Sequence, residues 1–304
     1  MNLRHLSYLV ALAREGHYGR AAMAVHVTQP TLSAAINQLE SELGVPLVLR
    51  SRQRFQALTA EGRQTLAWAQ RILADCESLQ QSLGELKGAL KGHLSIGVIP
   101  TAEPLIARLT RAVRDRYPGI SVTLLSRTSR EIERGLAEHR LDAGISYAEE
   151  PLDFETRAIP LYLERYFVVG VSRLLPLRRA KLARSISWRE AAALPLCLLS
   201  PDMQNRRLLD RHFSEAGVVP AVVAETNTLI GVLSHIYSGG WCGILPEAML
   251  DFLKGLRGVR ALPLVQPEIT HRIALIVPMR QPLSPLTQAI VSVAAELDLS
   301  GRTS

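Results

Sequence analysis

The chain of 304 residues has few cysteines, few aromatic side chains and no long apolar run. Its three cysteines, Cys76, Cys197 and Cys242, are far apart and odd in number, which argues against a disulfide framework. No apolar stretch reaches the ~18 residues of a transmembrane helix, and the start Met-Asn-Leu-Arg-His lacks the pattern of a signal peptide. We therefore expect no membrane segment and a reducing, cytoplasmic location.

Motifs of common enzyme classes are also missing. The sequence contains no Gly-x-Ser-x-Gly, no phosphate-binding glycine loop and no His-Glu-x-x-His. Its eight histidines show no metal-ligand spacing. We expect neither an enzyme nor a metal or cofactor site. The net charge of +7 favours a polyanionic partner, although many basic proteins bind no nucleic acid.

The segment from Gly19 to Gly44 has the pattern of two short helices joined by a tight turn. Thr28 stands where an N-cap belongs, Pro30 falls in the first turn, and Gly44 is suited to end the second helix. Apolar residues of that helix repeat at helical spacing at Leu32, Ile36, Leu39 and Leu43. This pattern indicates a helix-turn-helix, a motif that binds DNA.

The second helix, about residues 30–42, is expected to enter the major groove of duplex DNA. Hydrogen-bonding side chains on its exposed face suit the edges of bases. The residues predicted to contact DNA there are Gln29, Pro30, Thr31, Ser33 and Asn37.

A basic turn follows the helix-turn-helix. Residues 48–50 and 55–58 have the pattern of a small two-stranded wing, and Arg50, Arg52 and Arg54 lie at or near its tip. Guanidinium groups in such a wing would contact the DNA backbone or the minor groove. The alternative is an ordinary solvated turn.

A long helix is predicted from residue 59 to about residue 90. Its apolar residues alternate in steps of four and three, the spacing of a coiled-coil seam: Ile72, Cys76, Leu79, Leu83, Leu86 and Leu90. Since a monomer offers nothing obvious to cover such a stripe, we predict a dimerisation helix, carried mainly by Ile72, Leu79, Leu83 and Leu86. Cys76 is expected to be an inert seam residue.

Beyond a glycine-containing hinge, strands and helices alternate, which predicts mostly parallel sheets with helices on both faces. About 210 residues of this kind indicate two lobes, with crossings near Leu163 and Pro267. Strands are expected at 93–99, 120–125, 142–146, 166–171, 195–199, 221–225, 242–245, 259–263 and 271–277. Helices are expected at 103–116, 129–138, 187–193, 205–216, 228–238, 246–252 and 284–297.

The whole chain resembles the LysR-type transcriptional regulators. The resemblance rests on Ala21-Ala22, Gln29-Pro30, Leu32-Ser33, Ile36, Leu39-Glu40, Leu43-Gly44, Pro46-Leu47, Arg50, Leu58-Thr59 and Gly62, and in the second half on Ile96-Gly97, Tyr117-Pro118, 141–144 and 243–246. It implies an α/β fold preceded by an all-α winged helix-turn-helix, with a long linker helix and a two-lobed effector domain like that of periplasmic binding proteins.

The corresponding domain limits are 1–58 for DNA binding, 59–91 for the linker helix and 92–304 for the effector domain. Within the effector domain, lobe I is expected to comprise 92–163 and 268–304, and lobe II 164–267.

Ligands of open α/β folds bind beyond the carboxyl ends of strands, where helix N-termini expose free N–H groups. Thr101 and Ser129 occupy such positions, and the family resemblance implies ligand contacts there and at the corresponding ends of other strands. The predicted effector-binding residues are Pro100, Thr101, Ser129, Ser146, Tyr147, Met203, Gln204 and Thr228. The alternative is that these hydroxyls only cap helices.

Hydroxyls beside helix N-termini suit a small carboxylate or oxoanion. Similarity of the first half to regulators associated with formate dehydrogenase operons points to formate or another small carboxylate, while aromatic carboxylates stay open. Peroxide-sensing members of the family carry a cysteine near the positions of Met203 to Asn205, and this sequence has none there. A thiol switch is therefore not expected.

The expected partners are double-stranded DNA with a dyad-symmetric operator, a small-molecule effector, and further copies of the chain. The resemblance implies homodimers that assemble to homotetramers, with RNA polymerase as a candidate partner. A solute-binding module without a DNA-binding role is the alternative class. Salt-dependent binding to duplex DNA would distinguish the two.

Overall fold

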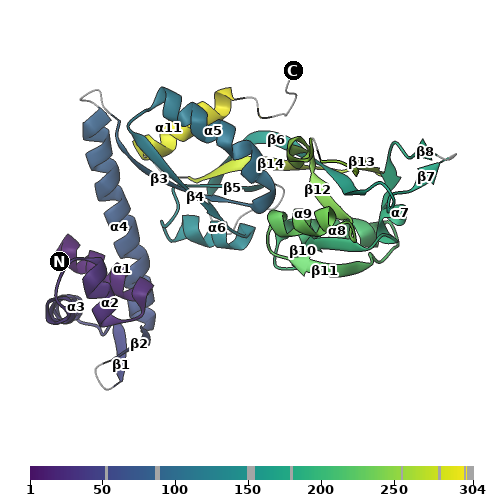
Figure 1. Ribbon diagram of the computed structural model, residues 1–304. Coiled ribbons are helices and arrows are strands. Elements are labelled where there is room, and N and C mark those ends of the chain that lie inside the picture. The colour runs from purple at the N-terminus through teal and green to yellow at the C-terminus, as the bar shows by residue number, and fades with distance from the viewer. Residues whose placement is uncertain are drawn as a thin grey trace. The chain divides into compact units, whose positions relative to one another are not determined.

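The computed structural model describes residues 1–51, 54–85, 90–148, 155–178, 181–254, 256–279, 282–297 and 299. They form two compact units (Figure 1). The first takes in Met1–Leu90 with the short segments Glu138–Arg140 and Leu283–Pro285, and the second holds the rest of the chain.

The first unit begins with three helices around a common core. They are α1 (Leu3–Glu15), α2 (Tyr18–Ala24) and α3 (Gln29–Leu43). The Thr28 side chain accepts a hydrogen bond from Thr31 N, and Gly44 ends α3 in the left-handed conformation, with φ of 70°. The three helices enclose a core of almost fully buried side chains: Leu6, Leu9, Leu12, Ala21, Leu32, Ile36, Leu39 and Leu47. The predicted helix-turn-helix is therefore present.

The wing and the linker helix follow as predicted. Strands β1 (Val48–Ser51) and β2 (Arg54–Leu58) pair antiparallel. Helix α4 runs over Ala60–Glu85. The Thr59 hydroxyl accepts from Gly62 N at 2.8 Å and donates to Pro46 O at 2.7 Å, so it anchors the start of α4 on the end of the helix-turn-helix.

Helix α4 buries its first part and exposes its second. Ala69 is fully buried and Ile72 packs on the core of the first unit. Leu79 and Leu83 lie further along the helix, and 60% and 53% of their surface is exposed. Leu86 lies outside the described residues. Ile72 therefore has apolar partners within its own chain, which the seam pattern did not predict.

The second unit is organised by an eight-stranded sheet, in the order β4-β3-β5-β14-β6-β13-β9 with β12 also paired to β6. The strand bounds are β3 (Gly92–Val98), β4 (Ile120–Ser126), β5 (Ala143–Tyr147), β6 (Thr156–Val171), β9 (Ile186–Ser187), β12 (Gly243–Pro246), β13 (Val259–Val265) and β14 (Thr270–Pro278). A second pair, β10 (Leu196–Leu199) and β11 (Val222–Thr226), is parallel. The short strands β7 (Leu177–Arg178) and β8 (Lys181–Leu182) pair with each other.

One strand, β6, serves both lobes of this unit. From Thr156 to Arg165 it pairs with β14, and from Tyr166 to Val171 it pairs with β12 and β13. The change of partner lies close to Leu163, where the sequence suggested a crossing. The domain and lobe limits themselves stay predictions.

The expectation of mostly parallel sheets is wrong. Strand β14 runs antiparallel to both β5 and β6, and β6 is antiparallel to β12 and β13. The strand expected at 166–171 in fact begins at Thr156. Its first half was not predicted because Pro160 and a register shift interrupt the alternation of buried and exposed residues there. The helix expected at 246–252 is divided into η2 (Glu247–Met249) and α10 (Leu250–Leu253).

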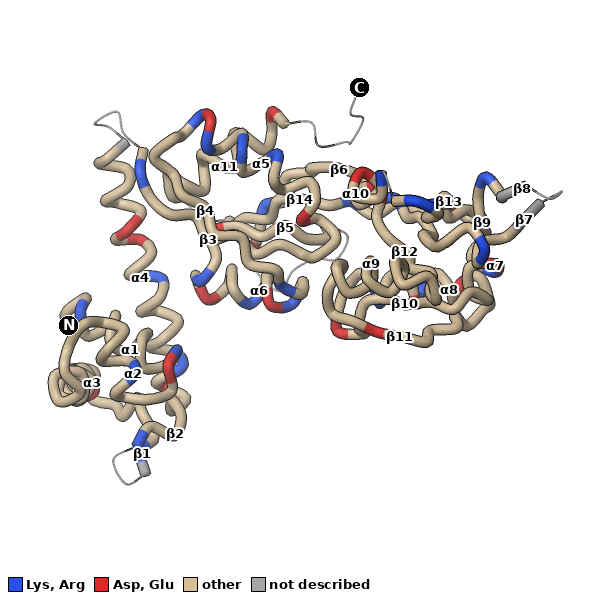
Figure 2. Tube along the Cα trace, in the orientation of Figure 1, with Lys and Arg blue, Asp and Glu red and all other residues tan. Residues whose placement is uncertain are grey.

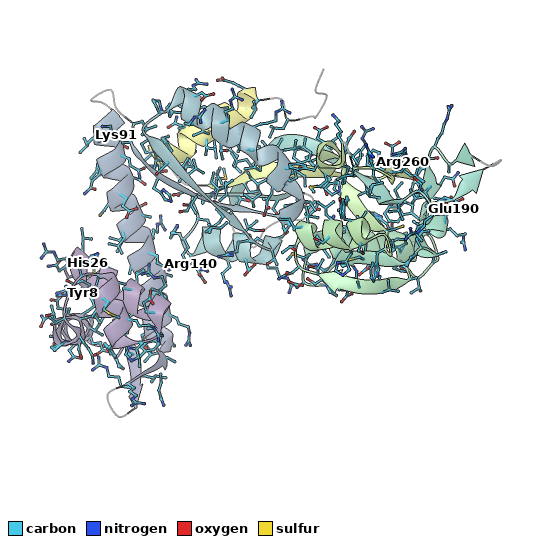
Figure 3. All side chains as sticks on the ribbon, in the orientation of Figure 1. Tyr8, His26, Lys91, Arg140, Glu190 and Arg260 are labelled. Carbon is cyan, nitrogen blue, oxygen red and sulfur yellow. The ribbon has the colours of Figure 1, made fainter. Side chains whose placement is uncertain are left out.

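Helices cover the sheets on both faces. In lobe I, α5 (Glu103–Arg116) and α11 (Pro285–Glu296) lie on one side of the sheet and α6 (Ser129–Ala137) on the other (Figure 1). Lobe II carries α7 (Trp188–Ala192), α8 (Gln204–Glu215) and α9 (Leu229–Ser238). Helix α7 starts with a reciprocal capping box between Ser187 and Glu190, which is labelled in Figure 3.

Within the described residues, no helix has both the length and the apolar character needed to cross a membrane.

Gly62 provides a test of the anchor at the start of α4. A Cβ at this position would overlap the carbonyl oxygen of Leu47, which belongs to the backbone and cannot turn away. We expect Gly62→Ala to destabilise the first unit by about 3 kcal/mol through this overpacking, measured by chemical denaturation. Gly240→Ala is the control, since a Cβ there meets no atom within 4 Å. Equal stability of the two variants would contradict the anchor.

Candidate functional site

A small cavity lies in the second unit where residues of both lobes meet. Its space is about 210 Å³, including the part open to solvent. The cavity is lined by Ile99, Pro100, Thr101, Thr128, Ser129, Tyr147, Leu199, Met203, Gln204 and Asn205. Among these described lining residues, none is Lys, Arg, His, Asp or Glu, so the polar atoms that face the cavity belong to hydroxyl, amide and backbone groups.

Three helix starts contribute to this lining. The short helix η1 (Pro100–Ala102) supplies Thr101, α6 supplies Ser129, and α8 supplies Gln204. Met203, the residue before α8, has no capping side chain, so the first N–H groups of that helix are not satisfied by a cap. Helix N-termini of this kind favour negatively charged ligands.

Helix α6 has a cap of its own. Thr128 N donates to Glu131 Oε2 at 2.9 Å, and Glu131 N donates to the Thr128 hydroxyl at 3.3 Å. The backbone hydrogen bond from Thr128 holds the pKa of Glu131 below its usual value. This cap fixes the position of Ser129 at the cavity wall.

The hydroxyl of Tyr147 is the centre of a buried polar network. It donates to Glu164 Oε1 at 2.9 Å and accepts from Asn205 Nδ2 at 3.3 Å. Thr101 Oγ1 lies 3.3 Å from the same oxygen. Burial raises the pKa of Tyr147 well above its usual value, with the nearby Glu164 adding to the effect, so the phenol keeps its proton. Because Asn205 belongs to lobe II, this network connects the two lobes.

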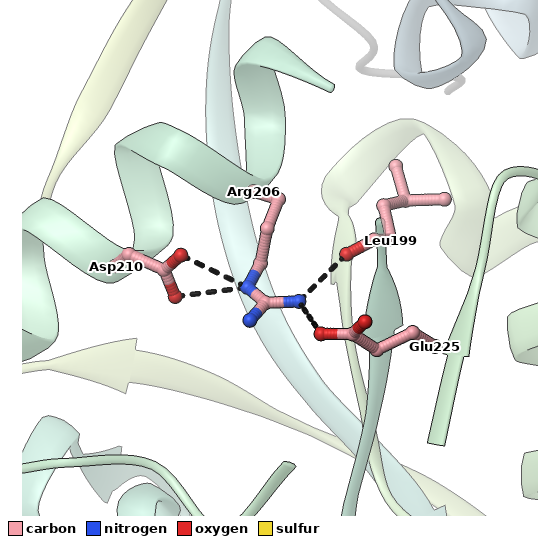
Figure 4. A network of polar contacts seen from close by, with 4 residues as sticks. All are labelled: Leu199, Arg206, Asp210 and Glu225. Carbon is pink, nitrogen blue, oxygen red and sulfur yellow. Dashed lines mark hydrogen bonds and ion pairs between the residues drawn. The ribbon is translucent and has the colours of Figure 1, made fainter. Parts of the chain in front are cut away.

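A buried arginine holds the start of α8 in place. Arg206 Nη1 donates to Leu199 O at 3.0 Å and contacts Glu225 Oε1 at 2.6 Å, and its Nε contacts both carboxylate oxygens of Asp210 (Figure 4). Its side chain is only 10% exposed. Arg206 thus ties α8 to the ends of β10 and β11. The adjacent Arg207 donates to Gln204 Oε1 at 3.1 Å through Nε and so orients a side chain of the cavity wall.

The cavity brings together six of the eight residues predicted to bind an effector: Pro100, Thr101, Ser129, Tyr147, Met203 and Gln204. Ser146 lies behind the wall, where its hydroxyl donates to Ser129 Oγ at 3.0 Å. Thr228 is an exposed N-cap of α9 and is not part of the lining. No structural observation tests the binding role of these residues, which stays a prediction.

Sequence reasoning missed four lining residues, Ile99, Thr128, Leu199 and Asn205. Asn205 had a usable signal, because it follows Gln204 in the first turn of α8. Ile99 and Leu199 are apolar strand ends and could not be distinguished from other core residues.

The predicted DNA-contacting face of α3 is accessible. Gln29, Pro30, Thr31 and Asn37 are exposed, and Ser33 is half-buried. Thr31 Oγ1 lies 2.8 Å from Thr28 Oγ1, so one of its hydrogen bonds is used within the helix start. The face is polar and uncharged, as expected for contacts with base edges.

The wing arginines differ in their surroundings. Basic positions mark β1 and β2 in Figure 2. Arg50 Nη2 lies 2.7 Å from Glu40 Oε2, while Glu40 Oε1 accepts from Leu47 N and Val48 N. Arg54 is exposed, and Arg52 lies outside the described residues. The structure therefore gives Arg50 a partner within the chain that the sequence did not predict.

No cysteine lines the cavity among the residues described. Cys197 and Cys242 are fully buried. Burial raises the pKa of both thiols, that of Cys242 to about 11. In the described part of the chain, no group of three or more His, Cys, Asp or Glu side chains could hold a metal ion.

Two family models match this chain. Residues 3–63 match "Bacterial regulatory helix-turn-helix protein, lysR family", and residues 87–298 match "LysR substrate binding domain". The second match alone covers more than half of the sequence. The chain belongs to the LysR family of transcriptional regulators.

Curated relatives agree with this assignment. The chain is 28% identical over 292 residues to the nitrogen assimilation regulatory protein nac of Escherichia coli, covering 95% of this chain and 93% of that protein. It is also 28% identical over 308 residues to a hydrogen peroxide-inducible genes activator of Haemophilus influenzae, covering 97% and 95% of the two chains.

Solved structures show the same fold. A full-length OxyR variant from Pseudomonas aeruginosa has a TM-score of 0.77 at 24% identity, covering 99% of this chain and 96% of that one. CbnR in complex with its target DNA has a TM-score of 0.68 at 22% identity, covering 97% and 99%. The protein is thus a DNA-binding transcriptional regulator with an effector-binding domain. The family assignment confirms that it is not an enzyme and removes the alternative of a solute-binding module without a DNA-binding role.

Proposed function

We propose that this regulator is switched by a small carboxylate or oxoanion bound in the cavity between the lobes of its effector domain. The observation that carries the proposal is the convergence of three helix starts and several hydroxyl groups on one cavity. Such an arrangement solvates an anion with N–H and O–H donors.

The size of the cavity favours a ligand of few atoms. The enclosed part of the cavity has room for about one water-sized group. Formate or another small carboxylate suits this space better than a substituted aromatic acid. Since the lining spans both lobes, bound ligand would favour one arrangement of the lobes over others, which is the basis of a population shift.

A panel of anions tests the proposed effector class. Formate, acetate, oxalate, sulfate, benzoate and muconate are added to the full-length protein at matched ionic strength, and thermal unfolding is recorded. A bound anion at a hundredfold excess over its Kd stabilises the native state by about 2.7 kcal/mol. We expect stabilisation by one or two small anions, lost in Thr101→Val but kept in Thr110→Val, which changes a half-buried threonine of α5 that does not line the cavity. A flat panel would contradict the proposal.

We also propose that α3 reads bases in the major groove through Gln29, Pro30, Thr31, Ser33 and Asn37. The wing, with Arg50, Arg52 and Arg54, would lie along the backbone. The exposed polar face of α3 supports the first assignment. Because Arg50 contacts Glu40, its guanidinium group would have to bind Glu40 and a phosphate at the same time.

Replacing Gln29 by alanine separates a base contact from a backbone contact. A base contact is worth about 1–3 kcal/mol at the specific site and little on random DNA. We expect that selective loss in equilibrium binding to duplexes. Gln38→Ala is the matched control, because this exposed glutamine lies nine positions further along the same helix and therefore on its opposite side. Equal losses on specific and random DNA would assign Gln29 to the backbone.

The exposed end of α4 supports a homodimer, from which a tetramer could assemble. Leu79 and Leu83 continue the helical apolar pattern but are more than half exposed in the single chain. Pairing two copies of α4 would cover them. Two recognition helices would then be presented to a dyad-symmetric operator.

A charge on the α4 stripe tests this dimer. Leu79→Asp would bury a carboxylate in an apolar seam, which dimers do not tolerate. We expect a protomer mass in light scattering for Leu79→Asp and the wild-type mass for Gln80→Asp, which changes the exposed neighbouring residue. An unchanged mass for Leu79→Asp would contradict a dimer through this helix.

Peroxide sensing is the second candidate, since one relative is a hydrogen peroxide-inducible genes activator. The local chemistry argues against it. The reactive form of cysteine is the thiolate, and burial keeps the thiols of Cys197 and Cys242 protonated. Met203, Gln204 and Asn205 provide no thiol at the cavity. The anion proposal is therefore the one we favour.

A further inference from the structure

Beneath the cavity, three neighbouring strands bring ionisable side chains together in the core. Tyr147 lies on β5, His271 on β14 and Glu164 on β6. Glu164 is 1% exposed and His271 is 5% exposed, and the two are directly opposite in the antiparallel ladder. Directly opposite residues share one face of a sheet. The carboxylate thus contacts the cavity wall through the Tyr147 hydroxyl, from which it accepts a hydrogen bond.

This cluster continues to the protein surface. His271 Nε2 lies 3.0 Å from His212 Nε2 on α8, and His212 Nδ1 lies 2.8 Å from Glu215 Oε2. The Glu215 side chain is 60% exposed. His212 thus links His271, at the edge of the buried cluster, to an exposed carboxylate.

The hydrogen bonds that the Tyr147 hydroxyl already makes leave it no hydrogen to donate to an anion. A phenol has one hydrogen to donate and two acceptor positions. Its hydrogen is used by Glu164, so Asn205 and Thr101 can only donate to its oxygen and together fill both acceptor positions. An ionised Glu164 can only accept, so it competes with a bound anion for the hydrogen of Tyr147.

We propose that Glu164 couples anion binding to the uptake of one proton. When an anion enters the cavity, Glu164 takes a proton from solvent and donates to the Tyr147 oxygen in place of Thr101. The hydrogens of Tyr147 and Thr101 then turn to the anion. This inference rests on the proposed function, because it describes how the same cavity accepts its effector.

Charge balance supports the coupling. No positively charged side chain is among the described lining residues, so an anion beside an ionised Glu164 would place two negative charges in one poorly solvated region. Protonation of Glu164 leaves the number of negative charges unchanged. The same balance selects singly charged anions, since a dianion such as oxalate would bring a second charge that no proton compensates.

The other charged groups around Glu164 have partners elsewhere. On β6, Arg165 is exposed on the opposite face and contacts Glu247 and Glu268. On β14, Arg272 is likewise exposed. The same face of β6 also carries Tyr162 and Tyr166, whose pKa values burial raises above the usual value, so both stay neutral.

Helix α8 carries three arginines besides His212, of which Arg211 is exposed. Arg206 is directed to Asp210 and Glu225, and Arg207 to Gln204 and the Asp202 carbonyl. Both are held by these contacts. Glu164, with the His271–His212 pair beside it, is therefore the group placed to respond to the anion.

The pH dependence of formate binding to the full-length protein tests this coupling. Formate carries one negative charge between about pH 6 and pH 9, so changes in its Kd report protons on the protein. If Glu164 is ionised in the free protein and protonated in the complex, Kd increases about tenfold per pH unit. Glu164→Gln, which cannot ionise, should bind with a Kd that does not depend on pH. Glu268→Gln, which removes an exposed carboxylate, should keep the wild-type dependence.

Each result has one meaning. If neither formate nor any other anion of the panel binds, the proposed function fails and the coupling with it. If formate binds the wild type with a Kd independent of pH, the proposed function stands and the coupling is wrong. If Glu164→Gln keeps the dependence, the proton resides on another group, such as the histidine pair, and the assignment to Glu164 is overturned.

Tyr147→Phe provides a second variant should Glu164→Gln fail to fold. It keeps the ring but removes the hydroxyl for which the anion and Glu164 compete. We expect weaker binding of formate with a smaller dependence on pH, because only the repulsion between the two negative charges remains. A dependence equal to that of the wild type would contradict the coupling. Calorimetric titrations in triethanolamine and in Tris at one pH count the protons taken up directly, and a wild-type value near zero would contradict the coupling as well.

Discussion

The effector domain depends on the continuity of one strand, β6, which pairs with β14 in its first half and with β12 and β13 in its second. Since the same backbone ladder holds both lobes, a change of their relative angle must be absorbed close to the change of partner at Arg165 and Tyr166. Glu164 lies directly before this point. The hydrogen bond that it accepts from Tyr147 therefore joins the strand shared by the lobes to the wall of the cavity.

The structure of the DNA-binding unit depends instead on contacts between residues that are close in sequence. Thr28 and Gly44 determine where α3 begins and ends, and Glu40 ties that helix to β1 through two backbone N–H groups. Thr59 then fixes the start of α4. These contacts connect the start of α4 to the end of α3 without involving the exposed polar face of α3.

This difference between the two units explains which features could be predicted from the sequence. Thr28, Pro30 and Gly44 act on residues close in sequence, so the helix-turn-helix was predicted closely. Strand ends followed by hydroxyls, together with the family resemblance, identified six of the ten residues of the cavity wall. The pairing of Glu164 with His271 joins residues more than a hundred positions apart, and no local pattern encodes it. The antiparallel course of β14 was missed for the same reason, since strand direction depends on connections rather than on periodicity.

The proposed regulation depends on an anion that binds where the helix starts converge. A crystal structure of the full-length protein with the anion that gives the largest thermal stabilisation would decide whether it does. We expect an anion within hydrogen-bond distance of Thr101 Oγ1 and of the N–H groups at the start of α8. An anion bound elsewhere, with this cavity empty, would refute the proposal.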